Sequence, residues 1–164
     1  MPAPIRILFV CLGNICRSPA GENVLRHVVT EAGVAKLFTI DSAGTANYHT
    51  GNAPDSRMRQ AARERDLPMT GGARQVQPRD FTEFDLILAM DRSNLRDLEG
   101  VRARCQAPTA ALHLFSEFCS KHQFTDTPDP YCGGAADFHH VLDLMEDGCT
   151  NLLDLWRKGE LHHR

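Results

Sequence analysis

The feature that most constrains the fold of this chain is an apolar run that stops at a glycine-containing loop, directly before a segment with helical periodicity. Residues Ile5 to Val10 are mostly β-branched, aromatic or aliphatic, which is typical of a strand covered on both faces. A loop follows from Cys11 to Ser18, and beyond Pro19 the apolar residues fall on one helical face. This order predicts a strand, an anion-binding loop and a helix whose N-terminus faces the loop.

Strands and helices continue to alternate along the chain, which predicts one α/β domain over residues 1–164. We expect the strands at residues 5–10, 37–40, 84–90 and 110–118. Helices are expected from Pro19 to Gly33, at 54–66, after Asp91 and from Phe138 to Trp156. The predicted architecture is a doubly wound, four-stranded parallel sheet in the flavodoxin-like order 2-1-3-4, with helices on both faces.

Composition and charge exclude several classes of function. A net charge of −3 and the absence of a basic run argue against nucleic-acid binding. No apolar run approaches the ~18 residues that a membrane span requires, so we expect no membrane partner. Six cysteines without a secretory leader before them favour a reducing, cytoplasmic setting over a disulfide framework.

Neither the cysteines nor the histidines are spaced like metal ligands. The four cysteines outside the loop lack such spacing: Cys105, Cys119, Cys132 and Cys149. The pairs His139-His140 and His162-His163 are expected to lie on solvated surfaces. We therefore expect no metal and no other cofactor.

Cys11 and Arg17 give the loop its predicted chemistry. Five residues separate them, so a loop that curls around one tetrahedral anion places the sulfur beneath it and the guanidinium beside it. The N–H groups of the loop and the positive end of the helix converge on the same point. Such a site stabilises a thiolate, and a thiolate aimed at phosphorus suits two-step phosphoryl transfer.

Segments spread over nearly the whole chain resemble one known family. Cys11-Leu-Gly-Asn-Ile-Cys-Arg-Ser-Pro19 is similar to the signature of the low-molecular-weight protein tyrosine phosphatases, and Asp129-Pro130-Tyr131 to their general-acid loop. Further matches are Asp41-Ser42-Ala43-Gly44-Thr45, Ala73-Arg74-Gln75 and Met90-Asp91-Arg92-Ser93-Asn94-Leu95. The resemblance implies hydrolysis of phosphotyrosine monoesters in proteins or peptides, with inorganic phosphate as product and competitive ligand.

The reacting groups are expected to come from three residues. Cys11 is the expected nucleophile, Arg17 binds the phosphoryl oxygens, and Asp129 is the candidate general acid and base. The rest of the phosphate-binding loop consists of Leu12, Gly13, Asn14, Ile15, Cys16 and Ser18. This set implies a phosphocysteine intermediate and requires no metal.

The resemblance also implies supporting roles. Ser42 is expected to hold Asn14, which shapes the loop. Cys16 is expected to protect an oxidised Cys11 by forming a reversible disulfide. The substrate cleft is expected to be lined by Leu12, Tyr48 and Tyr131.

Two positions depart from the family pattern. Gly71 stands where the family commonly has a histidine that braces the asparagine and serine, which leaves the rigidity of the loop open. Cys132 replaces the second of two tyrosines that often follow the Asp-Pro, so regulation by phosphorylation there is less secure. Asp91, at a predicted strand end, is expected to cap the following helix.

Three alternative functions stay open at this point. Phosphoarginine hydrolysis by close relatives goes with a threonine in place of Ile15, whereas isoleucine favours phosphotyrosine. Thiol-dependent arsenate reduction uses the same loop but needs no Asp-Pro acid. A phosphotyrosine-binding module without turnover would lack the nucleophile or the acid, and both are present. In each case we expect a monomer.

Overall fold

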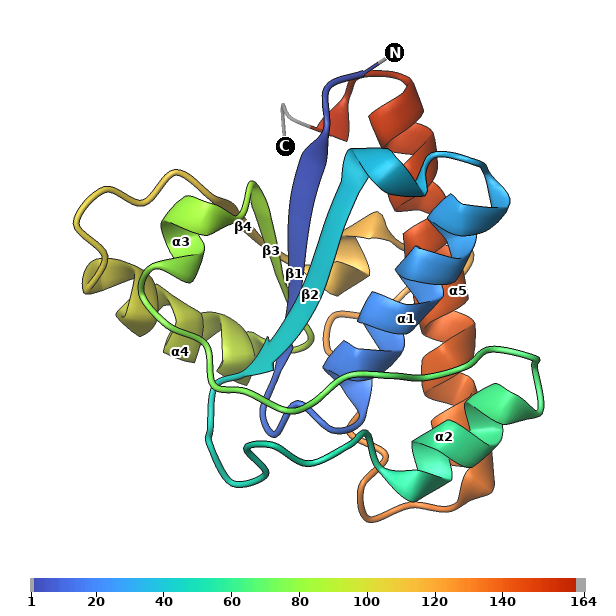
Figure 1. Cartoon of the computed structure of the whole chain (residues 1–164). Coiled ribbons are helices and arrows are strands. Elements are labelled where there is room, and N and C mark those ends of the chain that lie inside the picture. Colours follow the sequence, from blue (N-terminus) through green and yellow to red (C-terminus); the bar gives the residue numbers. More distant parts are fainter. Residues whose placement is uncertain (1, 162–164) are drawn as a thin grey trace.

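The computed structural model describes residues 2–161 and confirms the predicted α/β sheet (Figure 1). All pairs of strands are parallel, in the order β2-β1-β3-β4. The strands are β1 (Ile5–Cys11), β2 (Phe38–Gly44), β3 (Leu86–Ala89) and β4 (Ala111–Leu114). The apolar run that opens the chain is therefore one of the two central strands of the sheet.

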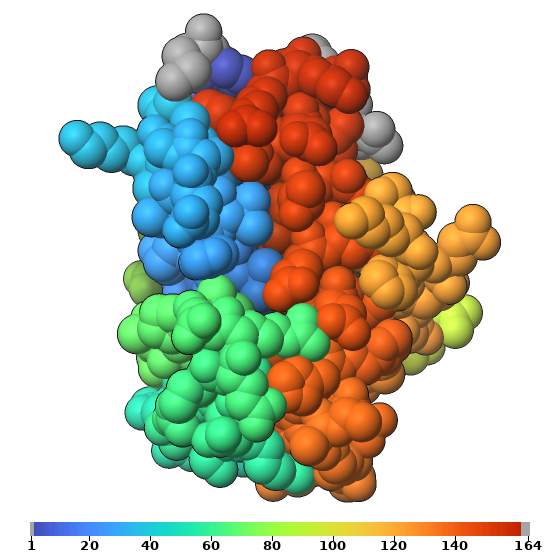
Figure 2. Space-filling view, turned by 90° about the vertical axis from the view of Figure 1, so that its right-hand side faces the viewer, coloured from blue at the N-terminus to red at the C-terminus, as the bar shows by residue number. Residues whose placement is uncertain are grey.

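Helices cover both faces of the sheet, as predicted (Figure 1). They are α1 (Arg17–Glu31), α2 (Ser56–Arg63), α3 (Asp80–Glu83), α4 (Arg92–Ala103) and α5 (Ala135–Arg157), with 3₁₀ turns η1 (Ala35–Leu37) and η2 (Phe115–Phe118). Figure 2 looks onto the face where α1 and α5 lie side by side, with α2 beneath them. None of the helices among residues 2–161 is long and apolar enough to cross a membrane.

Alternate residues of β1 supply two separate hydrophobic clusters. Ile7 and Phe9 pack with residues of α1 and α5, whereas Leu8 and Val10 pack with residues of α3 and α4. The predicted stripe of α5 is buried in the first cluster: Phe138, Val141, Leu142, Met145, Cys149, Leu152, Leu153 and Trp156. Full burial of each large apolar side chain contributes roughly 1.5–3 kcal/mol, so β1 is held firmly from both faces.

Several predicted boundaries differ from the observed ones. The fourth strand was expected at 110–118 but ends at Leu114, where the Glu117 carboxylate accepts the Leu114 N–H (2.9 Å) as the chain turns into η2. The second strand runs on to Gly44 because its pairing with β1 continues to Cys11. The helix expected at 54–66 is the shorter α2, which Asp55 caps by accepting the Arg57 N–H.

The parallel register brings distant segments to one edge of the sheet. Cys11, the last residue of β1, pairs with Gly44 at the end of β2. Val10 pairs with Ala89 at the end of β3. The loops that leave these strands therefore meet at the carboxyl edge, which is where open α/β sheets bind ligands.

Candidate active site

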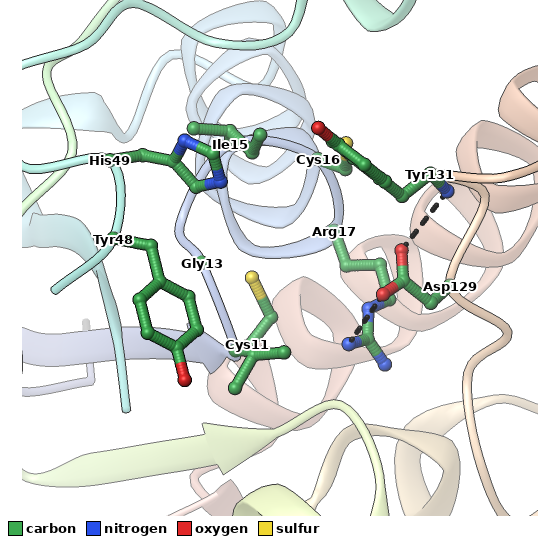
Figure 3. Close-up of a pocket in the computed structure, with 10 residues that line it drawn as sticks. Cys11, Gly13, Ile15, Cys16, Arg17, Tyr48, His49, Asp129 and Tyr131 are labelled. Carbon is green, nitrogen blue, oxygen red and sulfur yellow. Dashed lines mark hydrogen bonds and ion pairs between the residues drawn. The ribbon is translucent and has the colours of Figure 1, made fainter. Parts of the chain in front are cut away.

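A cavity of about 220 Å³ opens at the carboxyl edge of the sheet (Figure 3). We call residues 11–18 the phosphate loop and residues 126–134 the acid loop. The walls consist of Cys11, Leu12, Gly13, Ile15, Cys16, Arg17, Tyr48, His49, Asp129 and Tyr131. The expected nucleophile, cation and acid thus come together from both loops.

The Cys11 side chain points into this cavity from the end of β1 (Figure 3). Its sulfur lies 3.0 Å from the Ser18 hydroxyl. That hydroxyl accepts an N–H from Asn14 (2.8 Å), and its own hydrogen can go either to the sulfur or to the Ala43 carbonyl (3.3 Å). The helix begins at Arg17, two residues before the predicted start, and its positive end faces the same sulfur.

Asn14 holds the phosphate loop in shape. Its backbone is left-handed (φ 58°), a conformation that asparagine tolerates better than most residues. The side-chain amide donates to the hydroxyls of Ser18 (2.8 Å) and Ser42 (2.9 Å), and its oxygen accepts the Arg74 N–H (3.0 Å). Ser42 therefore lies where the supporting role requires it.

Glu22 is a member of this network that sequence reasoning missed. The Ser42 hydroxyl donates to its carboxylate at 2.6 Å, and Arg26 donates to the same carboxylate at 2.8 Å. Burial raises the pKa of Glu22, and the bonds from Ser42 and Arg26 partly offset this shift. Arg26 lies four residues after Glu22 on α1, and this spacing was the available signal for their pairing.

Glu22 also bears on the rigidity of the phosphate loop, which the glycine at position 71 leaves open. A Cβ added at Gly71 would lie 3.9 Å from the Glu22 carboxylate, so this carboxylate faces the position of the missing histidine. The Gly71 backbone has φ +118°, which a side-chain-bearing residue rarely adopts. Here the carboxylate braces Ser42 directly.

Gly44 lets the phosphate loop pass close to β2. A Cβ at this position would lie 2.6 Å from the Leu12 carbonyl oxygen and 3.1 Å from the Asn14 nitrogen. Both are backbone atoms, which cannot move aside as a flexible side chain can. The Ala46 N–H then donates to the Leu12 oxygen (2.9 Å) and fastens the loop to the segment after β2.

Arg17 is buried, with 3% of its side chain exposed, and is held by groups from two other segments. One terminal nitrogen donates to Asp91 (2.6 Å) and to the Thr127 carbonyl (3.0 Å). Asp91 also accepts the Asn94 N–H and so caps α4, which confirms its predicted role. Its pairing with Arg17 was not foreseen, because it depends on the meeting of two strand ends.

Asp129 faces the same guanidinium from the acid loop. Its carboxylate lies 3.7 Å from the second terminal nitrogen of Arg17 and accepts the Tyr131 N–H (3.1 Å), as Figure 3 shows. The side chain is 48% exposed. The carboxyl group is therefore placed at the mouth of the cavity that holds the Cys11 sulfur.

Comparisons with known proteins agree with this geometry. Residues 6–162 match the model of the low molecular weight phosphotyrosine protein phosphatase family. A Synechocystis sp. protein assigned to the low molecular weight protein-tyrosine-phosphatases is 46% identical over 91% of this chain and 94% of its own length. The chain belongs to this family.

Solved structures show the same fold. A protein tyrosine phosphatase from Entamoeba histolytica is 40% identical, with a TM-score of 0.89 over 96% of this chain and 99% of that chain. An arginine phosphatase from Drosophila is 30% identical, with a TM-score of 0.86 over 96% of this chain and 98% of that chain. The present protein is thus an enzyme of the low molecular weight phosphatase family, and the resemblance read from its motifs is confirmed.

The mouth of the cavity in this phosphatase is aromatic and exposed. Among residues 2–161, the large hydrophobic side chains classed as exposed are Leu12, Tyr48 and Tyr131, and all three line the cavity. His49, which sequence reasoning missed, lies next to Tyr48 on the wall of the cavity, with its ring centroid 6.4 Å from that of Tyr131 (Figure 3). A single histidine in an irregular polar loop carries no pattern that would have singled it out.

Cys16 shares the phosphate loop with Cys11 but differs from it chemically. Burial raises the pKa of the Cys16 thiol to about 12, and the neighbouring Asp55 carboxylate adds to the shift. Both thiols are free in the structure. Cys16 is therefore protonated at neutral pH.

Within residues 2–161 no group of three or more histidine, cysteine, aspartate or glutamate side chains is placed to hold a metal ion. His140 is exposed, as predicted, but His139 is partly covered and bonds to the Glu64 carboxylate at 2.6 Å. The reason is that α2 ends against α5 at this point, which the sequence did not reveal. The pair His162-His163 lies outside the described residues.

Proposed function

We propose that this phosphatase hydrolyses phosphotyrosine monoesters of proteins and peptides through a phosphocysteine intermediate. The observation that carries the proposal is that Asp129 lines the same cavity as Cys11 and Arg17, although it comes from a distant part of the chain. The exposed tyrosines at the mouth suit a flat phenyl ring. Inorganic phosphate, the product, binds the same loop and competes with substrate.

The first step transfers the phosphoryl group to the enzyme. The Cys11 sulfur attacks phosphorus, so a sulfur–phosphorus bond forms while the bond from phosphorus to the phenolic oxygen breaks. The N–H groups of the phosphate loop and the Arg17 guanidinium stabilise the charge on the three remaining oxygens. Protonated Asp129 gives its proton to the leaving oxygen, which typically contributes about 10² to 10⁴ in rate.

The second step regenerates the free enzyme. Water attacks phosphorus, Asp129 accepts a proton from this water, and the sulfur–phosphorus bond breaks to release phosphate. The Ser18 hydroxyl, 3.0 Å from the sulfur, stabilises the departing thiolate. In this step Asp129 therefore assists the attacking water and Ser18 assists the departing sulfur.

The cellular setting follows from the cysteines. Cys132 is exposed and Cys16 lies beside the nucleophile, and both are free thiols. A reducing compartment keeps them so, and we place the enzyme in the cytoplasm. Cys16 acts there as the partner that traps an oxidised Cys11 before irreversible oxidation.

Three variants test the proposal with an aryl phosphate substrate. Cys11→Ser is expected to abolish turnover, and Asp129→Ala to lower it by about 10² or more. Cys105→Ser is the matched control, because Cys105 lies beside Thr82 and does not line the cavity, and this variant should keep the wild-type rate. Rapid quenching followed by mass spectrometry should find one phosphoryl group on the Cys11 peptide. A wild-type rate in Cys11→Ser would end the proposed mechanism.

Phosphoarginine is the second candidate substrate, because an arginine phosphatase has the same fold and a cavity of this kind accepts either group. Ile15 lines the cavity, and its apolar side chain favours a phenyl ring over a charged guanidinium. Peptides that carry phosphotyrosine or phosphoarginine at the same position discriminate between the two. We expect the higher kcat/KM for phosphotyrosine, and the reverse order would reassign the substrate.

A further inference from the structure

Arg57, on the first turn of α2, reaches across to the acid loop. Its guanidinium donates to the Tyr131 carbonyl at 2.8 Å. The same group lies over two aromatic rings, 5.3 Å from the centroid of Tyr131 and 4.8 Å from that of Phe138. Because Phe138 is fully buried in α5, the guanidinium joins the exposed acid loop to the core.

The other end of this contact is the phosphate loop. Asp55 accepts three N–H groups of Arg57, from the backbone (2.8 Å), Nε (3.1 Å) and a terminal nitrogen (2.9 Å). The backbone N–H of Asp55 donates to the Ile15 carbonyl at 2.8 Å. Arg57 is therefore anchored, through one residue, to the loop that holds the nucleophile.

The contacts of Arg57 with Tyr131 also affect Asp129, the proposed proton donor, which lies two residues before Tyr131. The Tyr131 N–H donates to the Asp129 carboxylate, so the residue that orients the acid is the one whose carbonyl and ring Arg57 holds. The arginine hydrogen bond holds the pKa of Asp55 below its usual range, so the Asp55–Arg57 pair stays charged at neutral pH. A continuous set of contacts thus links Ile15 to Asp129.

We propose that Arg57 is a positioning residue that fixes the acid loop at the correct distance from the phosphate loop, and so sets the efficiency of leaving-group protonation. The proposal rests on the proposed role of Asp129 as general acid. It predicts that removal of Arg57 lowers kcat/KM by an amount that depends on the leaving group. Without Arg57 the acid loop adopts other positions. The value of kcat/KM then falls only for substrates whose leaving group must be protonated as it departs.

The experiment compares kcat/KM for two substrates, because this ratio covers the steps up to leaving-group departure. Phenyl phosphate releases a basic phenolate that needs protonation, whereas 2,4-dinitrophenyl phosphate releases a weakly basic one. For Arg57→Ala we expect about a tenfold loss with phenyl phosphate, a fraction of the full general-acid effect, and less than about twofold with the dinitrophenyl ester. Equal losses on both substrates would overturn the proposal.

Two further variants guard the interpretation. Arg63→Ala removes an arginine from the same helix that donates only to Gln60 among the contacts described, and it should leave both ratios unchanged. Arg57→Lys keeps a cation that can reach the Tyr131 carbonyl but not the fork that binds Asp55, so it should show the same pattern at smaller size. Circular dichroism shows whether the alanine variant folds, and if it does not, Arg57→Lys serves as the test. Equal losses of kcat/KM on both substrates would again refute the role of Arg57.

The double variant separates this proposal from the assignment of Asp129. In an Asp129→Ala background, Arg57→Ala should change neither ratio by more than about twofold, because the proton donor is already absent. If Asp129→Ala itself shows no dependence on the leaving group, the proposed function fails. If Asp129→Ala shows it and Arg57→Ala does not, only the role of Arg57 fails.

Discussion

The two loops that meet at the cavity are held in opposite ways. In the phosphate loop, Asn14, Arg17 and Ser18 are at most 3% exposed. Asn14 and Ser18 bond to each other and to β2, and Arg17 bonds to Asp91 and to the Thr127 carbonyl. In the acid loop, Tyr131 and the side chain of Asp129 are each 48% exposed, although Asp129 pairs with the buried Arg17. The comparison teaches that the proposed cradle for the anion is fixed when the chain folds, whereas the proposed proton donor lies in a loop with more exposed side chains, which opens at lower free-energy cost.

This difference separates stability from rate. A buried polar network that loses one member leaves the others unsatisfied, so damage to the phosphate loop should lower both the free energy of unfolding and anion binding. Exposed contacts are worth little to stability. Damage to the acid loop should therefore change rate alone.

The largest effect is expected from Gly44→Ala, which forces a methyl group against the backbone of Leu12. Overpacking of this kind costs about 1–3 kcal/mol, and we expect the inhibition constant for inorganic phosphate to rise at least about fivefold. Urea unfolding and phosphate inhibition measure the two losses. Gly100→Ala, in α4 with open space around the added carbon, is the control and should lose neither stability nor phosphate binding. Full retention of phosphate binding in Gly44→Ala would break the comparison.

A smaller effect, with a defined pH dependence, is expected from Glu22. Because burial raises its pKa, the folded chain binds this proton more tightly than the unfolded chain does. The contribution of Glu22 to stability therefore falls as pH rises from the ordinary glutamate pKa, about 4.3, through the raised value. Glu22→Gln should remove this slope from the free energy of unfolding, measured by denaturation across a pH series. An unchanged slope would contradict the assignment.

The smallest effect is expected from Arg92→Ala, which releases the start of the acid loop. Arg92 pairs with Asp126 at 3.0 Å, and their side chains are 70% and 40% exposed. We expect no measurable change in Tm and at most about a twofold change in kcat/KM, since exposed ion pairs contribute little. A clear drop in Tm would show that the acid loop is fastened as firmly as the phosphate loop.

The sequence predicted the fold because its signals are local and repeat along the chain. Strand-like runs alternate with helical stripes, and Gly33, with φ +74°, ends α1 where predicted. The error at β4 has a physical cause, because a short apolar run such as 110–118 suits a strand or a helical turn equally well. What decided it was the Glu117 side chain, which accepts the Leu114 N–H.

The candidate site was predicted in part. The contiguous motif from Cys11 to Ser18 determines its own loop, and the register of parallel strands explains why Ser42 lies beside it. Glu22 and His49 were missed, and Asp91 was predicted as a helix cap but not as the partner of Arg17, because only tertiary packing brings these side chains to their partners. Local patterns contain no information about such pairs.

The central position of β1 has a consequence for heating. Cys11 ends a strand that is paired on both edges and buried on both faces, whereas Asp129 sits in a surface loop. As temperature rises, the surface loop should loosen well before the sheet melts. The warmed molecule then keeps its anion cradle and its sulfur but loses its proton source, and it becomes an enzyme selective for esters whose alcohol departs unaided.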